Sequence, residues 1–209
     1  MQPFEFILTF ASLLVGLALA DITTSLHRLL RARARVRWDW LPLAATALVV
    51  LTVIQFWWAF YGIRRATAWT SYGRFVPLVA LLMVMFLLAS AALPDEVPPE
   101  GTDLSTYYAG NGRYFWSLFA LFILLAIPVG AIAYQAGWVV LVRQQTANLL
   151  LAGVLVSLAV VRQRRFHVVV VVLLLAVLGF RWSHLQLANP ASGNREHGQP
   201  SQTHPPVGS

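Results

Sequence analysis

The chain has no cysteine and no lysine, and only 11% of its residues are charged. Without cysteine it can form no disulfide, no thiolate metal site and no cysteine nucleophile. It also lacks a Gly-x-Ser-x-Gly elbow, a His-Glu-x-x-His zinc motif and a glycine-rich nucleotide loop. Nothing in the sequence therefore indicates an enzyme, and we expect no catalytic residue, no cofactor and no bound metal ion.

Apolar residues make up 58% of the chain and gather in six blocks. A helix of about 20 apolar residues crosses a hydrocarbon core of about 30 Å. Backbone groups in lipid must be satisfied within the segment, and the continuous apolar run 78–88 lacks the alternation of a barrel strand. We predict an all-α fold, a polytopic six-helix transmembrane bundle. Its spans lie at about 4–26, 41–62, 76–93, 114–135, 147–161 and 166–182.

These spans predict one membrane domain over residues 1–186. The last two spans are short, about 15 residues each or roughly 23 Å of helix. We therefore expect that arginines snorkel outward, that the bilayer thins, or that the final hairpin crosses incompletely. Residues 187–209 are rich in Asn, Pro, Ser, Gly and His and lack apolar periodicity, which predicts a disordered tail.

Arginine predicts the orientation, because cytoplasmic connections of membrane proteins carry an excess of basic residues. With the first connection inside, the inner side has nine arginines: Arg28, Arg31, Arg33, Arg35, Arg37, Arg113, Arg162, Arg164 and Arg165. The outer side has six: Arg64, Arg65, Arg74, Arg143, Arg181 and Arg195. We therefore predict that both termini lie outside the cytoplasm.

A removable secretory signal is the alternative for the first span, because Ala18 and Ala20 precede Asp21 in a small-x-small pattern. The leader has no basic residue, and cleavage would move the arginines of residues 28–37 to the translocated side. We favour a retained span for that reason.

The first span has a polar face at helical spacing, made of Glu5, Thr9, Ser12, Gly16, Thr23 and His27. Beside it runs a small-xxx-small series, made of Ser12, Gly16, Ala20 and Thr24. Such faces let helices approach closely and hydrogen-bond, so helix packing is the favoured interpretation and a substrate or ion path is the alternative.

Polar side chains inside the spans predict two local contacts. Gln55 lies at a depth similar to Thr9 and Ser12, so we predict that Gln55 forms a polar clasp with Thr9 or Ser12, in an intramembrane cluster that includes Glu5. A ligand contact of Gln55 at a narrow cavity is the alternative. Asp21 lies about 26 Å along the helix from the start of the span, near the inner edge of the hydrocarbon. It shares a face with Arg28, which predicts an interfacial ion pair, with a proton relay through Asp21 as the alternative.

The net charge of +7 is explained first by topology and lipid. Five arginines directly inside the first span, Arg28, Arg31, Arg33, Arg35 and Arg37, are a topogenic signal and predict binding of anionic headgroups. The chain offers no soluble platform for a nucleic acid, so none is expected as a partner.

Four stretches carry a resemblance: residues 12–21 (SLLVGLALAD), 25–31 (SLHRLLR), 35–40 (RVRWDW) and 55–58 (QFWW). Over about the first 60 residues the chain resembles an uncharacterised family of small bacterial integral membrane proteins. The resemblance implies a bacterial inner membrane as the location and brings no activity or ligand with it.

Two functions remain as hypotheses. The first is a non-catalytic integral membrane protein that acts by helix packing, by association with a second copy or a partner membrane protein, or by binding anionic lipid. The second is a small transporter or channel with a path along the polar face of the first helix. The break from Pro128 to Gly130 motivates the second, because interrupted helices often border binding sites.

Overall fold

The computed structural model describes residues 3–61, 71–134 and 138–183 of the chain. Six helices make up almost all of this part, which confirms the all-α fold. They are α1 (Pro3–Arg31), α2 (Trp40–Tyr61), α3 (Tyr72–Ser90), α4 (Leu104–Tyr134), α5 (Trp138–Val160) and α6 (Arg164–Ser183). The predicted disordered tail, residues 187–209, lies outside the described residues.

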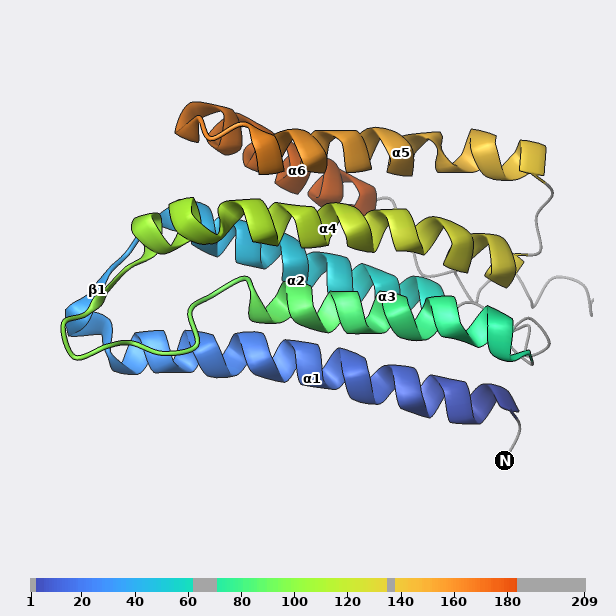
Figure 1. The fold of residues 1–209 in the computed structure, drawn as a ribbon, viewed down its shortest axis with the longest axis horizontal. Coiled ribbons are helices and arrows are strands. Elements are labelled where there is room, and N and C mark those ends of the chain that lie inside the picture. Colours follow the sequence, from blue (N-terminus) through green and yellow to red (C-terminus); the bar gives the residue numbers. More distant parts are fainter. Residues whose placement is uncertain (1–2, 62–70, 135–137, 184–209) are drawn as a thin grey trace, which may run out of the picture.

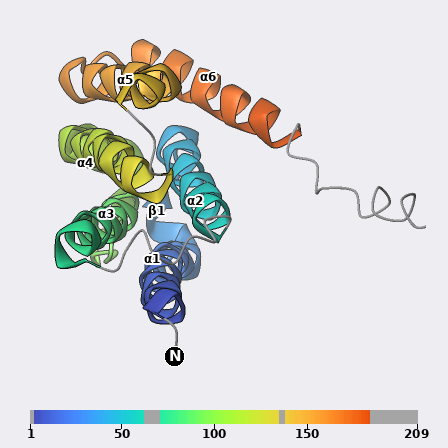
Figure 2. The same ribbon diagram turned by 90° about the vertical axis from the view of Figure 1, so that its right-hand side faces the viewer.

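The helices run roughly parallel or antiparallel to one long axis (Figure 1). Helix α4 is central, since it packs against α3 and α5, while α1 packs mainly against α3. Viewed along the bundle, α5 and α6 form a layer over α2 and α4, and α1 lies farthest from that layer (Figure 2). Leu78, Leu81, Leu82 and Met85 of α3 are fully buried, so α3 forms much of the core between α1 and α4.

The three connections at residues 32–39, 91–103 and 161–163 gather at one end of the bundle, the left end in Figure 1. We call this the arginine-rich end, because the arginines of residues 28–37 and 162–165 lie in or beside these connections. The first residues of α1 lie at the opposite end (Figure 1). The two ends therefore correspond to the two sides predicted from the sequence.

Four helices of the described chain are long and apolar enough to cross a membrane, which indicates an integral membrane protein. They cover Glu5–Arg31, Trp40–Phe60, Tyr72–Ser90 and Leu104–Ala133. The apolar stretch Gln145–Val160 of α5 is shorter. As a helix, however, α5 has 23 residues and α6 has 20, so neither is as short as the sequence predicted.

Helix α4 begins at Leu104, ten residues before the span predicted from 114. Asp103 caps it, because its carboxylate accepts hydrogen bonds from the backbone N–H groups of Ser105 at 2.8 Å and Thr106 at 3.3 Å. At 31 residues, about 46 Å of rise, α4 exceeds the hydrocarbon thickness. Helix α1, with 29 residues, exceeds it as well and runs to Arg31, five residues beyond its predicted span.

Both long helices project past α3 at the arginine-rich end. Asn111 of α4 donates to the carbonyl of Ala91, just after α3 ends, at 2.8 Å. Residues 104–110 of α4 therefore lie beyond α3. On α1, Asp21 accepts a hydrogen bond from Ser90, so residues 22–31 project likewise. Polar side chains of these two projecting segments hydrogen-bond to the connection that follows α3.

Two short strands lie at the arginine-rich end. Strand β1 (Val36–Arg37) pairs in parallel with β2 (Thr102–Asp103), with Val36 opposite Thr102, and so joins the α1–α2 connection to the α3–α4 connection. A 3-10 helix, η1 (Arg33–Arg35), precedes β1. Gly101 turns the chain into β2 with φ of +97°, and a Cβ there would clash with the backbone carbonyl of Arg35. Only glycine fits this position without strain.

We predict that Gly101→Ala destabilises the fold by about 1–3 kcal/mol. Alanine disfavours the positive φ of this position, and its Cβ would clash with the backbone carbonyl of Arg35. The measurement is thermal or denaturant unfolding of the purified protein in detergent. Gly110→Ala is the matched control, since Gly110 lies in α4 with nothing within 4 Å of an added Cβ. Equal stability of the two variants would contradict this account of Gly101.

Candidate functional site

The projecting part of α1 is held by the connection that follows α3. Ser25, which is buried, donates to the Asp95 carboxylate at 3.2 Å, and the Arg28 guanidinium donates to the Asp95 backbone carbonyl at 2.7 Å. The Asp21 carboxylate accepts from the Ser90 hydroxyl instead of pairing with Arg28. The predicted ion pair between Asp21 and Arg28 is therefore wrong. Each side chain faces α3 or the chain just after it, which sequence spacing along one helix cannot reveal.

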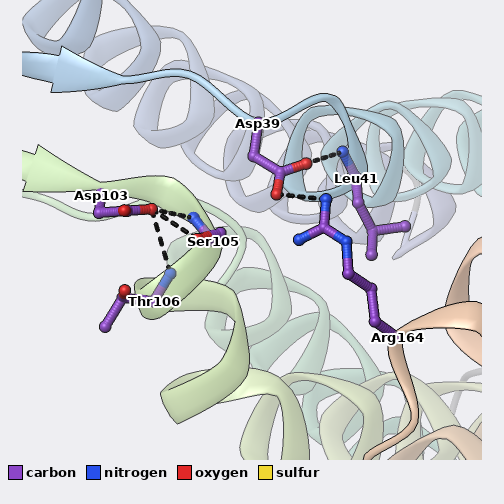
Figure 3. Close-up of polar contacts among 6 residues, drawn as sticks. All are labelled: Asp39, Leu41, Asp103, Ser105, Thr106 and Arg164. Atoms are coloured by element: carbon purple, nitrogen blue, oxygen red, sulfur yellow. Dashed lines mark hydrogen bonds and ion pairs between the residues drawn. The ribbon is translucent and has the colours of Figure 1, made fainter.

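Two aspartates start helices at this end, and each pairs with an arginine. Figure 3 shows both aspartates and the pair of Asp39 with Arg164. Asp39 accepts the Leu41 backbone N–H at 3.0 Å and pairs with Arg164 of α6 at 2.7 Å. The Asp39 side chain is only 8% exposed, whereas the Arg164 side chain is 57% exposed, so this pair joins the start of α2 to the start of α6 at the surface of the bundle. At Asp103, hydrogen bonds from the Ser105 hydroxyl and backbone N–H lower the pKa of the carboxyl. The Arg37 guanidinium lies 3.4 Å from the Asp103 carboxylate. The charged form of the Asp103 carboxyl that caps α4 therefore persists to lower pH than in an unfolded chain.

A buried hydrogen-bonded chain joins α4 to α6. The Nε2 of His167 lies 2.7 Å from the Val161 carbonyl, which can only accept, so Nε2 carries the proton. Nδ1 then accepts from the Tyr108 hydroxyl at 2.8 Å, and that hydroxyl accepts from the Trp116 indole at 3.1 Å. His167 is 6% exposed and Trp116 is fully buried. Every polar atom of the imidazole ring is satisfied, which is typical of a structural histidine.

These contacts were not predicted from the sequence, although two of them have a sequence signal. Asp39 and Asp103 each stand one or two residues before an apolar helix, the position of a helix cap. Tyr108 and His167 are separated by 59 residues and no spacing rule connects them. Only the packing of α4 against α5 and α6 brings them together.

The polar face of α1 points away from the bundle. Glu5, Thr9, Gly16, Thr23 and His27 are exposed and Ser12 is half-buried. The hydroxyl of Thr9 donates to the Glu5 carbonyl at 2.8 Å, and that of Ser12 donates to the Thr9 carbonyl at 2.8 Å, both within α1. The opposite face of α1, with Ala11, Ala18 and Leu29, is the one buried against the bundle. The packing predicted for the polar face is therefore not made by the part of the chain that the structure describes.

The structure does not bring the predicted intramembrane cluster together. Thr9 and Ser12 line a groove of about 590 Å³ on the outer side of α1, together with Gly16. Gln55 instead lines a cavity of about 450 Å³ between α2, α4, α5 and α6. Among the described residues no hydrogen bond joins Gln55 to Thr9 or Ser12. The predicted clasp is wrong because Gln55 lies on the face of α2 that is turned toward the α5–α6 layer.

The five arginines predicted to meet lipid headgroups are all exposed at the arginine-rich end. Arg28, Arg31 and Arg35 line a hollow of about 540 Å³ that also includes Asp95 and Glu96. Arg37 pairs with Asp103, and Arg33 lies in η1. Headgroup binding by these side chains stays a prediction.

No known protein family, curated protein or solved structure matches this chain. The resemblance to uncharacterised bacterial membrane proteins therefore stays a prediction as well. Within the described ranges, no three His, Asp or Glu side chains are grouped so that they could hold a metal ion. The function has to be argued from the geometry of the chain itself.

We predict that Tyr108→Phe lowers the free energy of unfolding by about 1–3 kcal/mol, because it leaves the His167 Nδ1 and the Trp116 indole N–H buried without a partner. Tyr114→Phe is the matched control, since Tyr114 is 51% exposed in the same helix. Chemical unfolding in detergent, followed by circular dichroism, measures both. If Tyr108→Phe unfolds like Tyr114→Phe, the chain of hydrogen bonds does not stabilise the fold.

Proposed function

We propose that the protein is a non-catalytic integral membrane protein that acts by association, pairing α1 with α1 of a second copy. In this proposal it lies in a bacterial inner membrane with both termini outside the cytoplasm, and its arginine-rich end lies against the anionic inner leaflet. Helix packing carries the function, and no reaction is assigned to it.

One observation carries the proposal: most of the small-residue series of α1 lies on the face that the bundle leaves uncovered. Gly16, Ala20 and Thr24 are exposed, and Ser12 is half-buried. A Cβ added at Gly16 would meet nothing within 4 Å. Membrane helices associate through such small residues, because they let two backbones approach closely. A face of this kind that has no partner helix among the described residues is suited to a helix from a second chain.

The same face of α1 also carries large exposed side chains, which could insert into the groove of a second copy. Leu13 and Phe6 are each 61% exposed and Leu17 is 47% exposed, and all three border the groove at Gly16. A two-fold dimer needs one patch that is complementary to itself, with ridge and hollow side by side. The groove on α1 meets that requirement, which favours a second copy over a different partner.

The charge distribution supports the orientation. Arg31, Arg33 and Arg35 are exposed at the arginine-rich end, and each basic side chain near an anionic leaflet adds about 1 kcal/mol of attraction. The positive-inside tendency acts in the same direction. Association with anionic headgroups would hold this end at the inner surface and fix the depth of α1 for pairing.

The alternative, a transporter or channel with a path along the polar face of α1, has less support. Thr9 and Ser12 line an external groove, whereas Gln55 lines a different cavity on the other side of α2. Within one chain these groups do not share a path. A pore at this face would need another chain to close over the groove.

Replacement of Gly16 tests the pairing. We expect the wild-type protein to dimerise in liposomes, and we expect Gly16→Ile to weaken the dimer by about tenfold or more, or ~1.4 kcal/mol, because a branched side chain keeps the helices apart. Gly153→Ile is the matched control, since Gly153 is exposed on α5 with open space around it. Single-molecule photobleaching at graded protein densities measures the dimer. A wild-type protein that stays monomeric at every density, or two variants that dimerise equally, would refute the proposal.

The absence of cysteine makes the orientation directly testable. We expect Ser71→Cys, at the start of α3, to react with a membrane-impermeant maleimide in intact spheroplasts. Ala34→Cys, in η1, should react only after permeabilisation, because the arginine-rich end is predicted to lie inside. The reverse pattern would overturn the proposed topology while leaving the pairing through α1 to be judged separately.

A further inference from the structure

One cavity of the molecule takes no part in the pairing of α1. It has a volume of about 450 Å³ and is lined mainly by residues of α5 and α6 and of α2 and α4. Figure 2 shows that α5 and α6 form a layer over α2 and α4. Its volume falls within the range of about 300–1,000 Å³ that is usual for small-molecule sites. Most of its lining is apolar, as in such sites generally.

Four uncharged polar side chains converge on this cavity: Thr52 and Gln55 from α2, and Gln145 and Asn148 from α5. Two of these side chains donate hydrogen bonds within the chain. Thr52 donates to the Leu48 carbonyl at 2.7 Å, and Asn148 donates to the Gln145 side-chain oxygen. Among the described residues, the whole Gln55 amide, the Gln145 Nε2 and the Asn148 Oδ1 have no hydrogen-bond partner. An amide in an apolar setting costs about 1–3 kcal/mol when left unpaired, so these groups favour a polar occupant.

The described lining favours a neutral occupant. Among the described residues no charged side chain lines the cavity. A charged group would enter an apolar surrounding without a counter-charge, which is strongly unfavourable. Amide groups donate and accept, so they suit hydroxyl and carbonyl groups on a ligand.

The polar groups lie nearer one end of the cavity than the other. By helical rise, Gln55 is about 9 Å from the end of α2 at Tyr61 and Asn148 is about 15 Å from the start of α5. The lining also includes Leu48 and Leu155, about 20 and 25 Å from those same helix ends, where it is apolar. A ligand that fits this layout has a hydrogen-bonding head toward the opposite end of the bundle and an apolar chain that reaches inward.

Helix α4 makes the room for such a ligand. Ala126, Gly130 and Ala133 line the cavity around Pro128, and a Cβ at Gly130 would already touch the Gln145 Nε2 at 3.5 Å. Small residues at these three positions keep α4 from filling the space beside α5. Larger side chains would close it.

We propose that this cavity binds a neutral single-chain lipid, whose hydroxyl or carbonyl head is bound by Gln55, Gln145 and Asn148 and whose acyl chain lies along Leu48, Phe119 and Leu155. Monoacylglycerol is the simplest lipid of this class. No described residue of α1 lines this cavity. A result against lipid binding would therefore not bear on the dimer, and a result against the dimer would not bear on lipid binding.

Photo-crosslinking tests the site. The full chain in phosphatidylcholine nanodiscs is exposed to a monoacylglycerol with a diazirine in its acyl chain, and to lysophosphatidylglycerol with the same diazirine chain and a charged phosphate. We expect the neutral probe to label peptides of α2, α4 and α5, and unlabelled monoacylglycerol to compete. The phosphate probe should not give this pattern. Uniform labelling of the outer surface by both probes would overturn the proposal.

Variants localise the site. Gln55→Leu changes the size little and removes the amide, so it should weaken labelling by about tenfold. Ala126→Phe should abolish labelling by filling the cavity. Gly179→Leu is the control, since Gly179 is exposed on α6 with open space around it. Circular dichroism and gel filtration report folding, and Gln55→Leu decides the question if Ala126→Phe misfolds. Unchanged labelling of Gln55→Leu would refute the assigned head-binding role.

Discussion

The need to satisfy every backbone N–H and C=O group within the chain is the constraint on which this structure depends. In an apolar surrounding only continuous helices meet it locally, and the described chain is built from little else. Helices α1 and α4 are longer than a hydrocarbon core is thick, so their surplus turns must project. The projecting turns meet the connections of the bundle at one end, where polar side chains can hydrogen-bond between helices.

Polar side chains follow three patterns, according to where the bundle places them. On the open face of α1, hydroxyls donate to carbonyls of their own helix and need no neighbour. At the arginine-rich end, Asp39 and His167 join one helix to another, and Asp103 joins β1 to the start of α4. In the cavity under α5 and α6, amides keep unused donors and acceptors. The first and third patterns leave capacity for an outside partner, and the two proposals use these two places.

Helix type and order could be predicted from the sequence, but several helix ends could not. A predicted span ends where apolar residues end, whereas a helix ends where hydrogen bonding ends. Residues 104–113 contain Asn111, Arg113 and two glycines, which indicated a connection, yet Asp103 caps a helix there. Likewise, α5 starts at Trp138, nine residues before the span predicted from 147, because the helix continues through the polar residues 143–146, which are not part of the predicted span.

The sequence by itself determined the six helices, the charge asymmetry between the connections and the polar face of α1. Each of these is periodic or compositional, and so is local. Only the tertiary structure decided which helices are neighbours, and therefore that Gln55 faces α5 and α6, that Asp21 faces Ser90, and that the polar face of α1 is left uncovered. The physical reason is that every helix here is apolar on most sides, so hydrophobicity alone does not choose its partner. That choice rests on the shape of the packed side chains, which no single helix contains.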